Sequence, residues 1–326
     1  MLLVSIIIPA YNSEKFIAAT IQTALDQTWP DKEIIIVDDG SSDNTLQIAK
    51  EFEIAHEGIK VYHQNNKGAC SARNMGFSLS KGNYIQFLDA DDLMEEQKIE
   101  KQMMKLQQEA DSIIGCRWIK FINTLDNNIG GTGPYETVRK DMTAVDWLLE
   151  RRMMVCHAWL TSRNLIEASG GWDEELSCNQ DGEFFYRVVG VAKKVLYQDD
   201  TIVYYRIPPD RNGVSVMNSP EKYISLYKAA VTYKNVLNAL TSHSDNAKKA
   251  IGNYFRRLEF DNFYPSFPGL IKLCKEQEEY SFANNKPELT GLTKAAAGFI
   301  GWKFAKRLSI WYRKVFTSVK HVQSKE

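Results

Sequence analysis

The sequence predicts an α/β protein with a mostly parallel β-sheet flanked by helices, followed by a helical C-terminal extension. Short runs of β-branched and other apolar residues alternate with amphipathic stretches in the first part of the chain. This alternation is typical of βαβ units, whose strands are buried on both faces. From Pro220 onward the apolar residues keep helical spacing instead.

The individual elements follow from this periodicity. The apolar runs predict strands over residues 4–8, 33–37, 61–63, 84–88 and 155–161, and the amphipathic stretches predict helices over 13–25, 43–52, 69–80, 95–109 and 183–189. A polar, Gly-rich stretch predicts a loop over 123–133. We place a domain boundary near residue 218, which gives a catalytic domain over 1–218 and a helical extension over 219–326.

Composition is that of an ordinary soluble protein. The chain has 326 residues, of which 44% are hydrophobic and 25% charged, with a net charge of −1. Its five cysteines have no CxxC spacing, which favours reduced thiols over a disulfide framework or a zinc site. The start of the chain is expected to be a strand and not a signal peptide, and the sequence contains no stretch of membrane-spanning length. We therefore expect a cytoplasmic protein.

Three carboxylates follow the apolar run 84–88 directly: Asp89, Asp91 and Asp92. Carboxylates crowded at a strand end repel one another unless a cation lies between them, and a hard divalent ion that grips a phosphate is the usual partner. Acidic residues in loops are often merely solvated, but here they end a buried strand. The pattern predicts a metal-dependent enzyme that acts on a phosphorylated donor.

Two more carboxylates, Asp38 and Asp39, end the run 33–37. The following Gly40 favours a turn, and Asp43 is suited to cap the next helix. Turn formation does not require two carboxylates at the tip of so apolar a strand. Hydrogen bonding of these carboxylates to a base edge or a ribose would account for them.

Four motifs occur in order along the chain: IPAYN (8–12), VDDGSSD (37–43), GACSARNMG (68–76) and LDADD (88–92). In sequence and spacing they resemble the inverting family 2 glycosyltransferases of the GT-A fold, over roughly residues 3–216. The resemblance implies a nucleotide-sugar donor, a UDP-sugar in our interpretation, and a divalent cofactor, Mn²⁺ or Mg²⁺.

The resemblance also assigns roles on the donor side. Asp39 would accept the uracil N3–H, Arg73 would lie near the diphosphate, Asp91 would carry the metal, Asp89 would lie beside the ribose, and Asp92 would support either role. For Arg73, a surface helix arginine is the alternative. The full set of implied nucleotide-sugar and metal residues is Pro9, Ala10, Tyr11, Asn12, Asp38, Asp39, Arg73, Asp89, Ala90, Asp91 and Asp92.

On the acceptor side, Asp181 matches the catalytic carboxylate of the family, a general base that removes the proton of the acceptor hydroxyl. Gln180 replaces the glutamate that usually precedes it, which should leave the pKa of Asp181 less elevated. The segment with Trp172, Asp173 and Glu174 is similar to the acceptor-side region of the family. Trp172 either stacks on a sugar face or belongs to the core.

A basic or histidine-containing stretch often closes over the diphosphate in this family. The corresponding segment here, 204–215, has no histidine. Arg206 or Arg211 is the candidate for charge neutralisation. The five histidines of the chain are isolated in the sequence and predict no metal cluster.

The C-terminal stretch 292–326 carries eight basic residues and a single acid, Glu326. On a helical wheel its apolar residues form one stripe opposite the basic ones, and these apolar residues are Phe304, Leu308, Trp311, Val315 and Val319. Such a helix either lies on an anionic membrane surface or packs on its own domain. A nucleic-acid partner is not expected, because the remaining chain is acidic.

These observations predict an inverting, metal-dependent transferase that moves a sugar to the hydroxyl of a glycan or lipid-linked glycan acceptor, in the synthesis of a surface polysaccharide or glycoconjugate. A non-catalytic carbohydrate- or nucleotide-binding module of the same fold is one alternative. A nucleotidyltransferase is the other, although it would want a Gly-rich phosphate loop after the first strand, which the sequence lacks.

Overall fold

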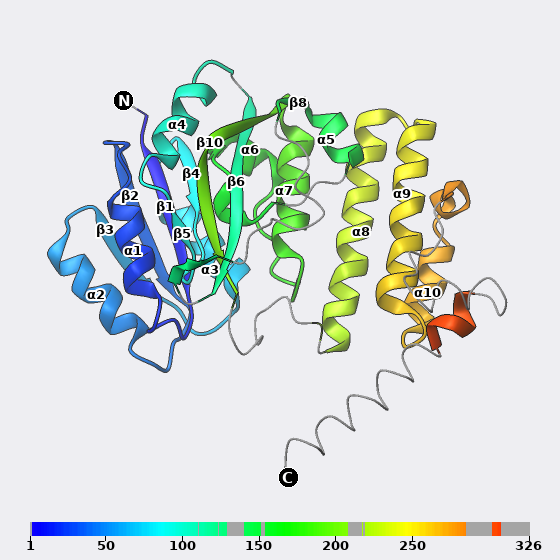
Figure 1. Cartoon of the computed structure of the whole chain (residues 1–326), viewed down its shortest axis with the longest axis horizontal. Coiled ribbons are helices and arrows are strands. Elements are labelled where there is room, and N and C mark those ends of the chain that lie inside the picture. Colours follow the sequence, from blue (N-terminus) through cyan, green and yellow to red (C-terminus); the bar gives the residue numbers. More distant parts are fainter. Residues whose placement is uncertain are drawn as a thin grey trace, which may run out of the picture. The chain divides into compact units, whose positions relative to one another are not determined.

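Figure 1 presents the computed structural model of the chain, which describes residues 2–109, 111–122, 124–128, 140–150, 154–207, 217, 219–284 and 302–307. The chain divides into two compact units, Met1–Ala247 and Lys248–Glu326. The boundary between these units lies later in the chain than the domain boundary that we predicted near residue 218. Helix α8 (Pro220–Thr241) therefore belongs to the first unit.

The first sheet has the strand order β3-β2-β1-β4-β9. Its strands are β1 (Val4–Ala10), β2 (Lys32–Asp38), β3 (Ile59–His63), β4 (Tyr84–Phe87) and β9 (Thr161–Ser162). The first four are parallel to one another, and β9 is antiparallel to β4. The predicted strands over 4–8, 33–37, 61–63 and 84–88 are therefore confirmed.

The second sheet has the strand order β5-β10-β6-β7, and β8 pairs with β10. Its strands are β5 (Leu93–Met94), β6 (Ser112–Ile122), β7 (Thr124–Asn128), β8 (Met142–Thr143) and β10 (Lys194–Arg206). The two long strands β6 and β10 run parallel, and the other pairs are antiparallel. The predicted loop over 123–133 is wrong at β7, because this short polar segment extends β6 into a hairpin.

Helices connect and cover the sheets. In the first unit they are α1 (Ile17–Leu25), α2 (Thr45–Ala55), α3 (Ala69–Leu79), α4 (Lys98–Leu106), α5 (Ala144–Glu150), η1 (Cys156–Ala158), α6 (Arg163–Ser169), α7 (Gln180–Val191) and α8. The strand predicted over 155–161 is wrong for most of its length, since the 3₁₀ turn η1 occupies this region. Helix α9 (Asp245–Arg257) spans the boundary between the units, and η2 (Leu258–Phe263), α10 (Pro268–Lys275) and η3 (Glu278–Phe282) follow it.

The core forms because β1 and β2 are apolar on both faces. Alternate residues point to opposite sides of a strand: Ile6 and Ile8 join the cluster that contains Ile17 and Ile21 of α1, while Ile7 faces α3. A Cβ on Gly76 of α3 would lie 2.5 Å from Cγ2 of Ile7, so this helix approaches the sheet at a position where glycine is needed. The first sheet is thus covered by α1 on one face and by α3 on the other.

The carboxyl ends of β1, β2 and β4 meet at one edge of the first sheet. The Asp39 amide donates to the Ala10 carbonyl oxygen over 2.8 Å, and the Leu88 amide donates to the Ile7 carbonyl oxygen over 2.9 Å. These bonds extend the pairing just past the strand ends. Ligands of open α/β sheets bind at such an edge, where the strand order reverses direction on the two sides of β1.

In the second unit, Trp302 packs on two aromatic rings that flank its indole. Its ring centroid lies 4.4 Å from that of Phe260 and 5.2 Å from that of Tyr264. Trp302 is half-buried and Ala305, one turn later, is fully buried, whereas Phe304 is 58% exposed. The remainder of the stripe predicted for the tail, from Leu308 to Val319, lies outside the described residues.

Among the described residues, no helix combines the length and the apolarity that crossing a membrane requires.

Candidate active site

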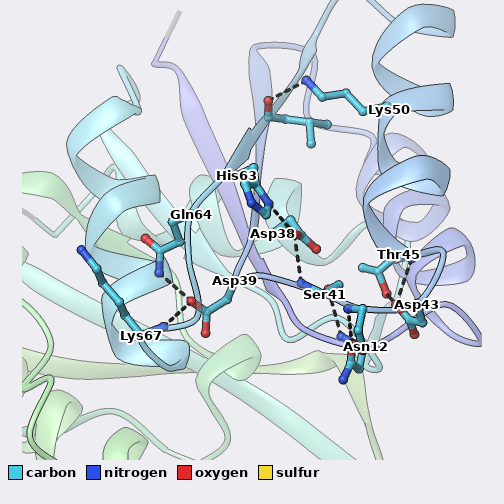
Figure 2. A network of polar contacts seen from close by, with 12 residues as sticks. Asn12, Asp38, Asp39, Ser41, Asp43, Thr45, Lys50, His63, Gln64 and Lys67 are labelled. Atoms are coloured by element: carbon cyan, nitrogen blue, oxygen red, sulfur yellow. Dashed lines mark hydrogen bonds and ion pairs between the residues drawn. The ribbon is translucent and has the colours of Figure 1, made fainter.

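Figure 2 shows the polar contacts around the ends of β1 and β2, including those of Asp39 with Gln64 and Lys67. One Asp39 oxygen, Oδ1, accepts hydrogen bonds from Gln64 Nε2 at 2.7 Å and from the Lys67 amide at 2.8 Å. The other, Oδ2, accepts from the Gly68 amide at 2.8 Å. The carboxylate thus holds the turn that leads into α3. Oδ2 keeps further acceptor capacity, so the predicted bond to a nucleobase N–H stays a prediction.

The loop after β1 is fastened to the loop after β2. The Asn12 amide donates to Ser41 Oγ at 3.0 Å, and Asn12 Oδ1 accepts from the Ser42 amide at 2.8 Å. Gly40 has a φ of +74°, and a Cβ there would lie 2.8 Å from the Asn66 amide nitrogen, so a side chain is excluded on both counts. Tyr11 is exposed beside this loop pair, whereas Pro9 and Ala10 are buried in β1. The predicted nucleotide residues Pro9 to Asn12 therefore lie at the end of β1 and in the loop after it, which hydrogen bonds join to the loop after β2.

Asp38 is fully buried and contacts His63, its pairing partner on the neighbouring strand β3. The distance from His63 Nδ1 to Asp38 Oδ2 is 2.8 Å, and the Ser41 amide donates to the same oxygen at 3.2 Å. Asp38 Oδ1 has no hydrogen-bond partner among the described residues. Pairing of β2 with β3 brings the two side chains together, although they are far apart in the sequence.

After β4, Asp89 forms an ion pair with Arg73 of α3, with 2.6 Å between Oδ1 and an Arg73 Nη. Arg73 is buried, also donates to Gln180 Oε1 at 3.3 Å, and lies with its guanidinium carbon 4.4 Å from the centre of the Trp172 ring. Burial acts to raise the pKa of Asp89, but the guanidinium outweighs it and holds that pKa below the usual range. The alternative of a surface arginine is wrong.

Asp91 and Asp92 have different surroundings within the same turn. Asp91 is partly exposed, and burial together with the Asp89 charge raises its pKa to about 6. Asp92 is fully buried, and its Oδ1 accepts from the Arg206 amide at 2.7 Å. Ala90, which precedes Asp91, is buried, and its carbonyl oxygen accepts from Thr20 Oγ1 at 2.9 Å. The turn is thus fastened to α1 and β10, and Asp91 is more accessible than Asp92.

His157 contacts Asp92 from η1, with 3.1 Å between Nδ1 and Oδ2. Neither atom has a hydrogen-bond partner among the described residues. Burial lowers the pKa of His157 to about 3, and burial with the Asp91 and Asp89 charges raises that of Asp92 well above its usual range. Both shifts in pKa disfavour the charged form of the group concerned, so they oppose an ion pair at this contact.

Arg206, at the end of β10 in the second sheet, supports the turn Asp89–Asp92, which we call the motif turn. Its Nε donates to the Asp91 carbonyl oxygen at 2.7 Å. The guanidinium carbon lies 4.6 Å from the ring centre of Phe16 and 4.3 Å from that of Phe121. Arg206 is 6% exposed, which favours a role in holding the turn over direct charge neutralisation. Arg211, the other candidate, lies outside the described residues.

Asp181 lies in the first turn of α7, as the sequence predicts, and faces the motif turn. Its Oδ2 accepts from the Cys156 amide at 3.1 Å. Burial raises the pKa of Asp181 to about 6, Arg73 acts against this rise, and Asp89 adds to it. The substitution of glutamate by Gln180 therefore leaves the pKa of Asp181 elevated, because burial is its main cause.

Asp89, Cys156 and Asp181 bring one ligand atom each to within 4.8 Å of one another. Carboxylate oxygens suit hard cations such as Mg²⁺ and Mn²⁺. Burial raises the pKa of the Cys156 thiol well above its usual range, and a neutral thiol is a poor ligand for such ions. The carboxylates of Asp89 and Asp181 suit a divalent cation. Among the described residues, Asp91, the predicted metal residue, is not a member of this group, although it follows Asp89 by two positions. Cys156 could not be found from sequence, since nothing in its spacing to Asp89 or Asp181 indicates proximity.

The acceptor-side residues have separate environments. Trp172 is 4% exposed, and its ring stacks on Phe184 with 4.0 Å between centroids, which favours the core alternative over sugar stacking. Asn74 Nδ2 donates to Glu174 Oε1 at 2.8 Å and to the Trp172 carbonyl oxygen at 2.9 Å. Asp173 Oδ1 accepts from the Glu175 amide at 2.9 Å. Glu174 is exposed and Asp173 partly so.

Comparison with solved structures supports this architecture. The chain matches a crystal structure of TarS from S. aureus in complex with UDP-GlcNAc with a TM-score of 0.60 and 19% identity, over 78% of this chain and 81% of that one. A TarS complex with UDP matches with a TM-score of 0.59 and 17% identity, over 86% and 89% of the two chains. The fold is therefore GT-A, and the predicted fold class is confirmed.

Curated relatives agree in family. The chain is 32% identical over 213 residues to the uncharacterized glycosyltransferase EpsJ of Bacillus subtilis, covering 64% of this chain and 62% of that protein. It is 33% identical over 210 residues to the chondroitin synthase of Escherichia coli, covering 63% and 29%. The matches thus span less than two thirds of the length of these relatives.

A family model decides the classification. The model described as "Glycosyl transferase family 2" matches residues 5–170, which contain all four motifs and the Asp89–Asp92 turn. The resemblance stated from the motifs is confirmed. The chain belongs to glycosyl transferase family 2.

Proposed function

We propose that this protein is an inverting, divalent-cation-dependent glycosyltransferase that moves a sugar from a UDP-sugar to a hydroxyl group of a glycan or lipid-linked glycan acceptor. The observation that carries the proposal is the approach of Asp181 to Asp89 across two separate parts of the chain, with the pKa of Asp181 raised to about 6. A carboxylate with such a pKa is a suitable general base near neutral pH. Family membership supports the same reaction class.

UDP is the nucleotide that the comparisons favour. TarS, whose fold this chain shares, was crystallised with UDP and with UDP-GlcNAc. In this chain the edge formed by Pro9, Ala10, Tyr11 and Asn12 with Asp38 and Asp39 would receive the uridine. The names of the relatives, which include a chondroitin synthase and a hyaluronan synthase of Pasteurella multocida, support a role in polysaccharide or glycoconjugate synthesis.

Asp91 and Asp89 would hold the cation, Mn²⁺ or Mg²⁺, and Asp92 would support the turn from its buried position. A divalent cation bound there would offset the negative charge of the departing diphosphate. Arg73 would act through Asp89, because its guanidinium is already engaged with that carboxylate and with Gln180.

The chemistry of the chain's own residues is a single displacement. Asp181 accepts the proton of the acceptor hydroxyl as its oxygen forms a bond to the anomeric carbon. The bond from that carbon to the diphosphate oxygen breaks on the opposite side, and its electron pair leaves with the nucleotide. The Cys156 amide, 3.1 Å from Asp181 Oδ2, keeps this carboxylate oriented. Asp173 and Glu174 would contact the acceptor.

The decisive experiment measures nucleotide release from a panel of nucleotide sugars with and without Mn²⁺. Asp181→Asn should retain UDP binding and lose sugar transfer. Asp111→Asn is the matched control, since Asp111 is exposed and has a positive φ that asparagine tolerates. Undiminished transfer by the Asp181 variant would remove the assigned base, and UDP binding without any turnover would favour a non-catalytic binding module.

We also propose that the protein is cytoplasmic and contacts the inner face of the membrane through residues 292–326. Phe304 is exposed on a short helical segment, while Trp302 packs on Phe260 and Tyr264. Lys303 and Arg307, on the same segment, are exposed and supply positive charge for anionic lipid.

Liposome flotation of the full chain tests the tail. Phe304→Asp should abolish flotation with anionic vesicles, whereas Leu273→Asp, at an exposed apolar position of α10, should leave it intact. Equal flotation of all three proteins would contradict membrane contact by the tail. The full chain is used because truncation at residue 292 would also remove Trp302 from its packing site.

A further inference from the structure

The segment from Cys156 to Trp159 touches both sides of the candidate active site. The amide of Cys156 donates to Asp181, and its sulfur lies within 4.8 Å of the ligand atoms of both Asp89 and Asp181. Cys156 is fully buried. The position of this segment therefore determines where the base lies relative to the motif turn.

The three residues after Cys156 each have their carbonyl oxygen held by a buried polar side chain. Gln86 Nε2 donates to the His157 carbonyl oxygen at 3.1 Å. Gln102 Nε2 donates to that of Ala158 at 3.0 Å, and Lys98 Nζ donates to that of Trp159 at 3.2 Å. Lys98 also bonds to Gln86 Oε1. We call Gln86, Lys98 and Gln102, all of them 0% exposed, the carbonyl clamp.

The carbonyl clamp comes from the elements on either side of the motif turn. Gln86 lies in β4, three residues before Asp89, and Lys98 begins α4, six residues after Asp92. Lys98 and Gln102 are one helical turn apart and so share a face of α4. The elements that carry the donor-side carboxylates thus also hold the segment that orients the base.

The segment cannot fix its own orientation. Its turn is closed by two backbone hydrogen bonds, from the Ala158 amide to Val155 and from the Trp159 amide to Cys156, at 3.1 and 3.2 Å. A single turn of 3₁₀ helix with so few bonds is weak by itself. Contacts from outside the turn must therefore set the direction of the Cys156 amide.

Burying the carbonyl clamp opposes folding. An amine and two amides taken out of water each cost free energy unless hydrogen bonds replace their hydration. Burial lowers the pKa of Lys98 to about 7, and Gln102 Oε1 has no partner among the described residues. An apolar side chain at position 102 would remove the unpaired Oε1 but, within the described part of the chain, would leave the Ala158 carbonyl oxygen with only the weak donor Cys116 Sγ, at 3.5 Å. The bond from Gln102 therefore holds that carbonyl oxygen in place.

We propose that Gln86, Lys98 and Gln102 are positioning residues of the transfer reaction, which hold the Cys156–Trp159 segment so that the Cys156 amide keeps Asp181 at a fixed place relative to the Asp89–Asp92 turn. The inference rests on the proposed function of Asp181 as the base. It adds three residues that touch neither donor nor acceptor.

Gln102→Leu is the sharpest test, because leucine removes the bond to the Ala158 carbonyl oxygen. The unpaired Oε1 is removed with it, which offsets part of the loss, so the melting temperature should fall only slightly. We expect kcat to fall roughly 10-fold to 100-fold, the loss typical of a reacting group displaced by about 1 Å. KM for the donor and the Kd of UDP should stay within about twofold, since no donor contact changes. A crystal structure of the variant should show Asp181 Oδ2 farther than 3.1 Å from the Cys156 amide.

Lys101→Met is the matched control on the same helix. Lys101 Nζ also donates to a carbonyl oxygen, that of Asp200 at 2.6 Å, but it points away from the segment. This variant should keep the kcat of the unmodified protein. An unchanged kcat in Gln102→Leu, or equal losses in both variants, would overturn the positioning role.

The two proposals fail in different ways. If the unmodified protein turned over no nucleotide sugar, the proposed function would fail, and with it the clamp's role in transfer. If the unmodified protein and Lys101→Met transferred sugar and Gln102→Leu did so equally well, the function would stand and the carbonyl clamp would be structural.

Discussion

Two groups of adjacent carboxylates follow buried parallel strands of one sheet, and their surroundings differ. Asp39, after β2, accepts three hydrogen bonds from its own chain, two of them from backbone amides. Asp91, after β4, is raised in pKa to about 6 by burial and by the charge of Asp89. After β2, hydrogen-bond donors of the chain stabilise the carboxylate of Asp39. After β4, several carboxylates lie close together and the chain neutralises their charge only in part.

The difference lies in the donors and not in the carboxylates. The turn before α3 presents the amides of Lys67 and Gly68 to Asp39. The turn of Asp89–Asp92 instead uses its hydrogen bonds to fasten its backbone to Thr20 and Arg206. Arg73 serves Asp89 but leaves Asp91 with a raised pKa. A carboxylate cluster that needs a cation can thus be told from one that does not by the number of donors within reach.

The largest expected effect tests the second group. Asp91→Asn should lower sugar transfer by about 10²–10³-fold, the range for loss of one charge-stabilising group in an active site. It should also remove the stabilisation by Mn²⁺, which would reach about 2.7 kcal/mol at a concentration 100-fold above Kd. Thermal melts with and without Mn²⁺ measure this. If Asp91→Asn kept the full Mn²⁺ response, the cation would lie elsewhere.

Asp39→Asn tests the first group and should act on stability instead. The amide loses the charge that strengthens three hydrogen bonds, and its NH₂ group cannot accept from the Lys67 or Gly68 amide. We expect the free energy of unfolding to fall by about 2 kcal/mol, measured by urea denaturation. Mn²⁺ should stabilise this variant as much as it stabilises the unmodified protein. A loss of the Mn²⁺ response here would erase the contrast between the two groups.

Much of the donor side was predictable from sequence because its signals are local. Each strand and its following polar motif occupy a few consecutive residues, so periodicity predicted β1 to β4, and the motif order indicated the family. The place of Asp181 at a helix start was predictable for the same reason, since the residues around it form a local motif; its role as the base stays a prediction.

The contacts that complete the site depend on distant segments. His157 approaches Asp92, and Cys156 approaches Asp181, because η1 packs between β4, α4 and α7, and no spacing in the sequence encodes this packing. Trp172 shows a related limit. A tryptophan near an acidic motif is compatible with either sugar stacking or the core, and its contacts with Phe184 and Arg73 were needed to favour the core.

The pH dependence of transfer sharpens the comparison at Asp181. The pKa of this carboxyl is raised to about 6, so it is protonated at pH 5, where an ordinary aspartate would be ionised. Since the base must be ionised, kcat/KM should decline below pH 6 and approach a tenfold loss for each further pH unit. Asp111→Asn should show the same profile. A decline that begins only near pH 4 would mean that burial does not control this group.

The smallest expected effect removes one donor from Asp39. Gln64→Leu takes away the bond to Oδ1 and leaves those from the Lys67 and Gly68 amides, so we expect a loss of about 1 kcal/mol in the free energy of unfolding. Mn²⁺ should not restore this loss. The amides of Lys67 and Gly68 still donate to the Asp39 carboxylate, and the substitution brings no second carboxylate close to it. Suppose instead that Mn²⁺ restored the stability lost in Gln64→Leu but not the stability lost in Asp39→Asn. Asp39 itself would then respond to a cation, and the carboxylates after β2 would differ from those after β4 in degree and not in kind.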